Sequence, residues 1–302
     1  MKNLLMVTTG GGYSYAERIF KSIMFLSPDA NVEIVPYNRI KLFPGFEPEN
    51  TVIYMRAAHP SPHGWMGKLI ELEDRGYVII NSTNCLLTTS NKSRCAQLLQ
   101  NNIPHPKTWI VDKQVLTWEY IYDIFHEDAS IFKYVVKPQT SKSQGANVRL
   151  IDYDDGIDSA LRTIEEVLGN LVVLQEYVPY IALHRVIVFN GISLPYTFVD
   201  KPEWHANGDW KVSVCLNKTT MQYNEYGDKE LLDMAVKAQK IVGGEINFID
   251  IFETLDGYVM NEINTACNLH IHEQLARVAG ESNWNIHRMI AKYLLERVKE
   301  LS

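Results

Sequence analysis

Short apolar runs alternate with amphipathic segments over the first third of the chain, a pattern typical of strands and helices that follow one another in turn. Strands are predicted at Leu4–Thr8, Val32–Pro36, Thr51–Met55 and Tyr77–Asn81. This alternation favours a small parallel sheet. Glycines 10–12 follow the first strand, but Tyr15 stands where a dinucleotide-binding fingerprint requires its third glycine. We therefore interpret that segment as a plain turn.

The rest of the chain mixes strands and helices less regularly. Further strands are predicted at Thr108–Val111, Lys133–Lys137, Val148–Ile151 and Leu171–Tyr177, and helices at 92–101, 118–125, 157–168, 229–242 and within 282–301. Asn91 and Asp228 occupy positions where a polar side chain caps a helix, and Gly243 ends the helix that Asp228 begins. The last helix is interpreted as a structural cover.

Two hairpins are predicted in the second half of the chain. In the first, His184–Phe189 and Ile192–Val199 flank Asn190-Gly191, a pair that strongly favours a type I′ turn. Arg185 lies in its apolar first strand, where a guanidinium needs a carboxylate or a phosphate as partner.

The second hairpin surrounds Asp256-Gly257, and its loop length decides which residues face each other. A two-residue loop, Asp256-Gly257, pairs Ile251 with Glu262 and puts Asp250 and Glu262 on opposite faces. A three-residue loop, Leu255–Gly257, pairs Asp250 with Glu262 directly. We favour the longer loop, because a left-handed glycine suits its third position.

In the favoured register, Asp250, Glu262 and Asn264 share one face of the hairpin. Two carboxylates opposed across strands repel each other unless a positive charge lies between them. A hard cation such as Mg²⁺ prefers oxygen ligands of this kind. In the alternative, one carboxylate faces solvent and the other pairs with a lysine.

A polar loop follows Lys137 and contains Ser141, Ser143 and Gly145. A serine- and glycine-rich loop with a lysine at its entrance is suited to fold over phosphates through its backbone N–H groups. An ordinary surface turn is the alternative. Arg56 ends another strand, where ligands of open α/β sheets gather, and a surface charge is the equally supported alternative.

Composition narrows the function classes further. The net charge of −7 argues against a general nucleic-acid binder. The four cysteines are far apart, with no CxxC pair, and are predicted to be free thiols in a reducing compartment. No apolar stretch approaches the ~20 residues of a membrane span, and the N-terminal apolar run is too short for a signal peptide. These observations predict a cytoplasmic location without membrane association.

Taken in order, these segments resemble the ATP-grasp superfamily, most closely the RimK-like carboxylate–amine ligases, over nearly the whole chain. YVVKPQTSKSQGANVRLI resembles the nucleotide-binding lysine and glycine-rich loop, VVLQEYVPYIALHRVIVFNG the hinge and the arginine strand after it, and FIDIFETLDGYVMNEINTA the Asp…Glu-x-Asn metal motif. The resemblance implies an α/β chain with α+β subdomains. Its parts are expected at residues 1–90 (a parallel-sheet pre-ATP-grasp domain), 91–180 (a central ATP-grasp subdomain) and 181–302 (a C-terminal ATP-grasp subdomain).

The resemblance also implies roles for particular residues, with ATP and Mg²⁺ as cofactors (two ions, with Mn²⁺ as a substitute). Lys92 and Lys137 would contact the phosphates, beneath the loop that contains Ser141, Ser143 and Gly145. Gln175, Glu176, Tyr177 and Val178 would form the hinge that holds adenine. Asp250, Glu262 and Asn264 would hold the metal, Arg185 would stabilise an acyl phosphate, and Arg56 and Lys211 would contact substrate.

The implied reaction is attack of a substrate carboxylate on ATP, followed by displacement of phosphate by an amine. The expected partners are small-molecule or peptide carboxylates and amines, with a homo-oligomer left open. An ATP-grasp kinase and a non-catalytic nucleotide-binding protein are the alternatives. Asn91 and Leu183 depart from the acidic residues that the family often has at these places. Two further departures, Lys211-Val212-Ser213 and Thr265-Ala266-Cys267-Asn268, fall where family members contact the acceptor, so they leave the substrate open. His270 and His272 are interpreted as solvated.

Overall fold

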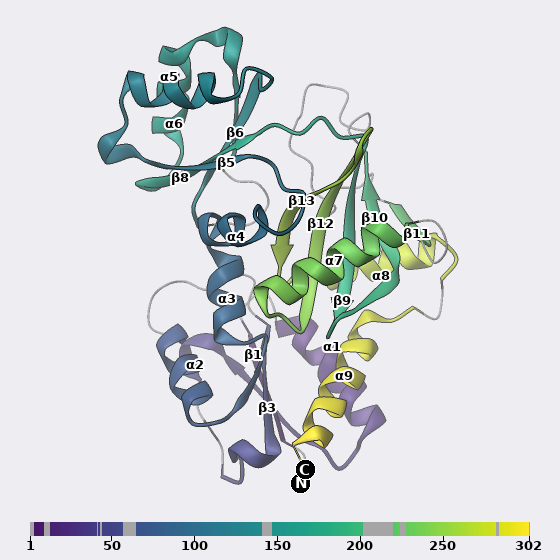
Figure 1. Cartoon of the computed structure of the whole chain (residues 1–302). Helices are drawn as coiled ribbons and strands as arrows, with labels where there is room; N and C mark the ends of the chain where they lie inside the picture. The colour runs from purple at the N-terminus through teal and green to yellow at the C-terminus, as the bar shows by residue number, and fades with distance from the viewer. Residues whose placement is uncertain are drawn as a thin grey trace.

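The computed structural model describes residues 3–8, 13–40, 42, 44–56, 65–140, 147–201, 220–223, 228–281 and 284–301. The described residues form three sheets with accompanying helices. The first sheet lies at the base of Figure 1, the second at its upper left and the third at its right. Within the described residues, none of the helices is long and apolar enough to cross a membrane.

The first sheet is parallel, as the N-terminal alternation predicted. Its strands are β1 (Asn3–Thr8), β2 (Asn31–Pro36), β3 (Thr51–Arg56) and β4 (Val78–Ile80), in the order β2-β1-β3-β4. The helices that accompany it are α1 (Tyr13–Leu26), α2 (Trp65–Asp74) and α3 (Thr83–Ser90). All six residues of β1 and of β3 are buried, as expected for strands covered on both faces.

The second sheet is antiparallel, and helix α4 (Lys92–Leu99) leads into it. Its strands are β5 (Thr108–Asp112), β6 (Lys133–Pro138), β7 (Arg149–Asp152) and β8 (Leu171–Glu176), in the order β5-β8-β6-β7. Helices α5 (Trp118–Glu127) and α6 (Ile157–Glu166) pack against it around a core that includes Phe125, Tyr134 and Ile164.

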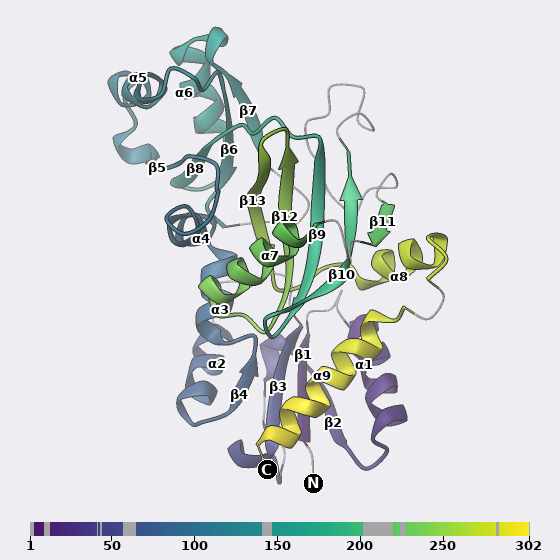
Figure 2. The ribbon, with the colours of Figure 1, turned by 45° about the vertical axis from the view of Figure 1, so that its right-hand side comes forward.

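The third sheet carries most of the chemistry described below. Its strands are β9 (Ala182–Phe189), β10 (Ile192–Asp200), β11 (Thr220–Tyr223), β12 (Ile246–Thr254) and β13 (Gly257–Asn264), in the order β11-β10-β9-β12-β13. Helix α7 (Lys229–Val242) covers one face of this sheet, where it packs on apolar strand residues such as Val186, Ile249 and Met260. Figure 2 shows α7 lying across these strands. The type I′ turn is confirmed, because Phe189 pairs with Ile192 and both Asn190 and Gly191 have positive φ.

The chain ends with α8 (Leu269–Val278) and α9 (Ile286–Glu300). Helix α9 returns to the base of the molecule and packs beside α1, so the two chain ends lie close together (Figures 1 and 2). Its apolar residues Ile290 and Leu294 share one core with Leu4 and Ile19. The interpretation of this helix as a structural cover is therefore confirmed. Short 3-10 helices lie at Tyr37–Arg39, Pro48–Asn50, Lys113–Val115 and Tyr153–Asp155.

The structure corrects some local predictions. Helices α3 and α8 were not predicted. Asp228 stands at the N-cap of α7 but makes no capping hydrogen bond, and its carboxylate accepts from the Tyr258 hydroxyl at 3.0 Å instead. Asn91 does cap α4, accepting from the backbone N–H of Arg94. Cys85, Cys95 and Cys267, the described cysteines, are free thiols as predicted.

Candidate active site

A row of charged side chains crosses three adjacent strands of the third sheet. Arg185 on β9 pairs with Asp250 on β12, and Asp250 pairs with Glu262 on β13. Since directly opposed residues share a face, these three side chains, here called the charged row, point away from α7. The predicted opposition of Asp250 and Glu262 is therefore confirmed.

The turn that produces this opposition differs from both predicted loops. Thr254 pairs with Gly257, so the loop is the two-residue Leu255-Asp256, and the register then shifts between Asp250 and Ile251. Ile251 pairs with Met260 and Asp250 with Glu262, which leaves Asn261 as an additional residue in β13. Such a β-bulge turns the following side chains to the other face. Without it, Glu262 would face the apolar core beneath α7.

Asp250 is held by a bidentate arginine. Arg185 Nε donates to Oδ1 of Asp250 at 2.6 Å, and Nη2 donates to Oδ2 at 2.7 Å. Both side chains are less than a tenth exposed. Burial raises the pKa of Asp250, and the guanidinium opposes that rise. Asn264 Nδ2 approaches the same carboxylate at 3.4 Å, so the third predicted metal ligand also lies against Asp250.

Glu262 is held by a lysine that comes from a different part of the chain. Lys92 Nζ donates to Glu262 Oε1 at 2.7 Å. The Asn91 cap fixes the first turn of α4, and the Lys92 N–H donates to the Gln139 carbonyl at 2.8 Å at the entrance of the 141–146 loop. Loss of solvent raises the pKa of Glu262, but the charge and hydrogen bond of Lys92, together with Lys137, bring it below its usual range.

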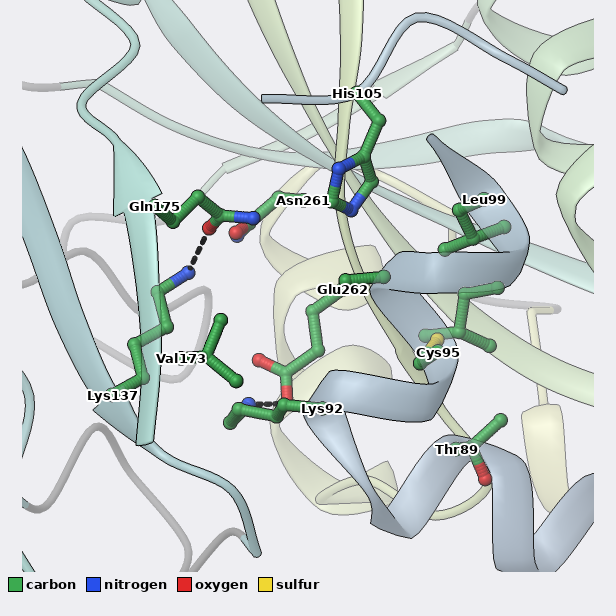
Figure 3. Close-up of a pocket in the computed structure, with 12 residues that line it drawn as sticks. Thr89, Lys92, Cys95, Leu99, His105, Lys137, Val173, Gln175, Asn261 and Glu262 are labelled. Atoms are coloured by element: carbon green, nitrogen blue, oxygen red, sulfur yellow. Dashed lines mark hydrogen bonds and ion pairs between the residues drawn. The ribbon is translucent and has the colours of Figure 1, made fainter. Parts of the chain in front are cut away.

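Lys137 enters the same pocket from β6. Its Nζ donates to Gln175 Oε1 at 2.7 Å, and Gln175 Nε2 donates to the Thr108 hydroxyl at 3.0 Å. Loss of solvent and the nearby charge of Lys92 lower the pKa of Lys137 to about 8. In Figure 3, Glu262 points between the two lysines.

The pocket lies between α4, the second sheet and β13. It is lined by Thr89, Lys92, Cys95, Ala96, Leu99, His105, Lys137, Val173, Gln175, Asn261, Glu262 and Ile263. Sequence reasoning did not find His105, Asn261 or the wall formed by Cys95. Burial lowers the pKa of His105 to about 4, so this imidazole is neutral at physiological pH. The Pro-His-Pro segment around His105 was recognised only as the end of a helix.

The predicted hinge continues from β8 out of the second sheet. The Glu176 N–H donates to the Lys107 carbonyl at 2.9 Å, and the Tyr177 N–H donates to the Lys133 carbonyl at 2.9 Å. Both N–H groups are therefore already hydrogen-bonded within the chain. Ser141, Ser143, Gly145 and Lys211 lie outside the described residues.

Arg56 is not a surface charge. It is only 4% exposed, its guanidinium lies 5.1 Å from the centre of the Tyr15 ring, and Nη2 donates to the Cys267 carbonyl. The interpretation of His272 as solvated is also wrong, because this residue is fully buried and burial lowers its pKa to about 3. Arg56 therefore contacts the segment that follows β13 and is not among the residues that line the pocket.

Asp250 and Glu262 of the charged row, together with Asn264, offer a donor set that fits a hard divalent cation. These two carboxylates and one amide lie on one face of the sheet, and Lys92 and Arg185 now neutralise the negative charge. Carboxylate and amide oxygens are the ligands that Mg²⁺ and similar ions take, together with phosphate oxygens.

Comparison with known proteins agrees with this geometry. A family model for the RimK-like ATP-grasp domain matches residues 89–290. The alpha-aminoadipate–LysW ligase LysX of Saccharolobus solfataricus is 26% identical over 242 residues, which cover 76% of this chain and 77% of that protein.

Two solved structures share the fold. One is the ATP-grasp ligase PsnB complexed with precursor peptide PsnA2 and AMPPNP, with a TM-score of 0.64, 16% identity and coverage of 98% of this chain and 97% of that chain. The other is the D-cycloserine synthetase DcsG, with a TM-score of 0.67, 15% identity and coverage of 98% and 99%.

Because the family match spans most of the chain, this protein belongs to the RimK-like ATP-grasp family. The predicted fold class is confirmed, and the chain is an ATP-dependent ligase of a family that uses ATP and a divalent metal.

Proposed function

We propose that this protein activates a carboxylate with ATP and couples it to an amine through an acyl phosphate. The observation that carries the proposal is the convergence of Glu262, at one end of the charged row, with Lys92 and Lys137 on one pocket. A nucleophilic serine or cysteine is not needed for this chemistry. Cys95, which lines the pocket, has its pKa raised to about 12 by burial and remains a thiol.

Lys92 and Lys137 are proposed to bind ATP phosphates. In the pocket, the Lys92 amino group donates to the Glu262 carboxylate and the Lys137 amino group donates to the Gln175 amide oxygen, each at 2.7 Å. Phosphate oxygens would give Lys137 a charge-assisted hydrogen bond in place of the neutral amide oxygen of Gln175, and would give Lys92 a second anionic partner. Ser141, Ser143 and Gly145 would close over the phosphates, and Gln175 to Val178 would hold adenine.

Asp250, Glu262 and Asn264 are proposed to hold Mg²⁺, in one or two ions, with Mn²⁺ as a substitute. When bound, the metal neutralises charge on the transferring phosphoryl group. Lys92 is paired with Glu262 at 2.7 Å, and phosphate oxygens would give this lysine another anionic partner, which would free Glu262 to hold the metal.

In the first step, an oxygen of the substrate carboxylate attacks the γ-phosphorus and the bond to ADP breaks. In the second, the amine attacks the acyl carbon, inorganic phosphate leaves with the bonding electron pair, and the nitrogen loses a proton. Arg185 is proposed to stabilise the acyl phosphate, because its fixed, permanently charged guanidinium lies beside Asp250. Positioning and charge are what the protein supplies.

The substrates are proposed to be an amino acid and either a peptide or a small molecule. LysX is named for α-aminoadipate and LysW, PsnB is complexed with a precursor peptide, and DcsG is named for D-cycloserine. Arg56 and Lys211 are the proposed substrate contacts.

We also propose a cytoplasmic location, in keeping with the free thiols. The domain boundaries are proposed to lie near residues 90 and 180.

An isotope experiment tests the proposed intermediate. A substrate whose carboxylate carries ¹⁸O should transfer one ¹⁸O atom to inorganic phosphate as the amide forms, and mass spectrometry detects both products. A phosphorylated hydroxyl product, with no label in free phosphate, would instead identify a kinase.

A further inference from the structure

A second cluster of chemically active side chains lies outside the active site, where α8 and α9 meet α1. His270 and Glu273 are three residues apart on α8, so they share one face of that helix. His287 comes from the first turn of α9. One nitrogen from each histidine and one carboxylate oxygen lie within 4.8 Å of one another.

The hydrogen bonds of this cluster leave two imidazole nitrogens without a partner among the described residues. His287 Nδ1 contacts Glu273 Oε1. His287 is 2% exposed, and its Nε2 is one of the unpartnered buried atoms. His270 Nδ1 is the other. Buried polar atoms in folded proteins normally have partners, so this pair requires an explanation.

We propose that His270, Glu273 and His287 bind a divalent cation of the Zn²⁺ type, at a site separate from the charged row. Two imidazoles and one carboxylate are a ligand set that zinc takes in proteins. His287 Nδ1 and Glu273 Oε1 now contact each other, so a cation between them would replace this contact with two metal–ligand bonds.

The ligand atoms have to move only a short way to reach an ion. The three ligand atoms lie within 4.8 Å of one another. Zinc–nitrogen bonds of roughly 2.0–2.1 Å require these atoms to come somewhat closer together. His270 is partly exposed and packs against Tyr15, with ring centres 4.4 Å apart and the ring planes tilted by 40°. Rotation of this side chain brings its ring towards His287, whose ring centre lies 5.6 Å away.

Arg18 is the local competitor for such an ion. Its Nη1 lies 3.4 Å from Glu273 Oε2, a long contact from a guanidinium side chain that is 52% exposed. An ion pair of this length, with one exposed partner, is weak. Arg56 also lies nearby, but it is held by the Tyr15 ring and the Cys267 carbonyl. A bound cation therefore has to displace one exposed side chain.

The site would brace the junction between the first and third sheets. Helix α8 follows β13 directly, α9 packs on α1, and the metal would join α8 to α9 beside α1. The charged row offers carboxylate oxygens, which Mg²⁺ prefers, whereas this cluster offers two imidazoles, which Zn²⁺ prefers. The ligand types would therefore direct Mg²⁺ to the charged row and Zn²⁺ to this cluster.

Zinc titration of the full chain by calorimetry, in excess Mg²⁺ and after treatment with a chelator, tests this proposal. We expect tight binding of one ion in the wild type and at least a tenfold loss of affinity in His270→Ala. His126→Ala removes an exposed histidine on α5 and should bind as the wild type does. Glu262→Gln should also leave zinc affinity unchanged, which excludes the charged row as the binding site.

Arg18→Gln provides a variant in which no ligand is removed. It should bind zinc as tightly as the wild type or more tightly, because the competing cation is gone. Zinc should also raise the melting temperature of the wild type and of His126→Ala but not that of folded His270→Ala. Equal affinity in wild type and His270→Ala, or weaker binding in Arg18→Gln, would overturn the proposal.

Discussion

Asp250 and Glu262 face each other across β12 and β13 because Asn261 bulges out of the second strand. The tight Leu255-Asp256 turn alone would set Asp250 opposite Asn261 and turn Glu262 towards α7. Because the bulge leaves Asn261 unpaired, the next carboxylate lies on the pocket side of the sheet. The metal ligands proposed here depend on that local irregularity as much as on their own identity.

Deletion of Asn261 tests the role of the bulge. In the deletion variant Glu262 follows Met260 directly, so a regular ladder from the Leu255-Asp256 turn again sets Glu262 opposite Asp250, and ATP turnover should be largely retained. The double variant Asn261→Glu/Glu262→Asn keeps the composition but moves the carboxylate to the unpaired position. It should lose about a hundredfold or more of the ATP turnover, the order of loss for a transition-state electrostatic partner. Steady-state kinetics of both variants decide the matter, and equal losses in the two would contradict the account.

Arg185 and Asp250 form a buried pair whose members should be energetically coupled. Arg185→Met leaves an unpaired buried carboxylate and should lower the free energy of unfolding by about 3–5 kcal/mol. The double variant Arg185→Met/Asp250→Asn should recover a substantial part of that loss, since no charge is then stranded. Urea unfolding of the two single variants and the double variant gives the coupling free energy. Additive losses would show that the pair is not coupled.

The lowered pKa of Lys137 predicts a pH dependence of nucleotide binding. Phosphate binding requires the charged ammonium, and the pKa of this group is lowered to about 8 in the absence of nucleotide. The dissociation constant of ADP should therefore rise as the pH increases above about 8, by up to about tenfold per pH unit, because binding must then take up a proton. Lys137→Arg keeps its charge and should show no such rise. Calorimetric titrations from pH 7 to pH 10 compare the two proteins, and parallel pH profiles would assign the dependence to another group.

Lys92 should contribute to nucleotide affinity as well as to the position of Glu262. Lys92→Met removes one charge-assisted hydrogen bond, worth about 1.5–3 kcal/mol, and should weaken ATP binding by roughly tenfold to a hundredfold. Lys229→Met removes an exposed lysine on α7 and serves as the matched control. An unchanged dissociation constant for Lys92→Met would remove this lysine from the phosphate site.

The sequence predicted the architecture well because its strongest signals are local. Short runs of apolar residues located most of the strands, and Asn190-Gly191 identified one hairpin with its turn type. The opposition of Asp250 and Glu262 was also predicted, although through the wrong loop. A bulge has no clear sequence pattern here, because Asn261 resembles any polar residue in a strand.

The parts that sequence reasoning missed depend on distant segments. His105 lines the pocket only because α4, β6 and β13 come together around it. Helix α8 was overlooked because His270, His272 and Glu273 obscure its helical pattern, and the structure buries His272 completely. Burial of a polar residue by tertiary packing cannot be read from spacing alone.

ADP release in the presence of ATP and Mg²⁺, with a panel of amino acids and peptides, tests the central claim most directly. We predict release that requires both a carboxylate and an amine, with an amide among the products, and that falls to background in Glu262→Ala and in the near-isosteric Glu262→Gln. Tight ATP binding without turnover on any pair in a broad panel would contradict the ligase assignment and favour a nucleotide-binding protein. Turnover that persists in both variants would instead contradict the proposed metal site.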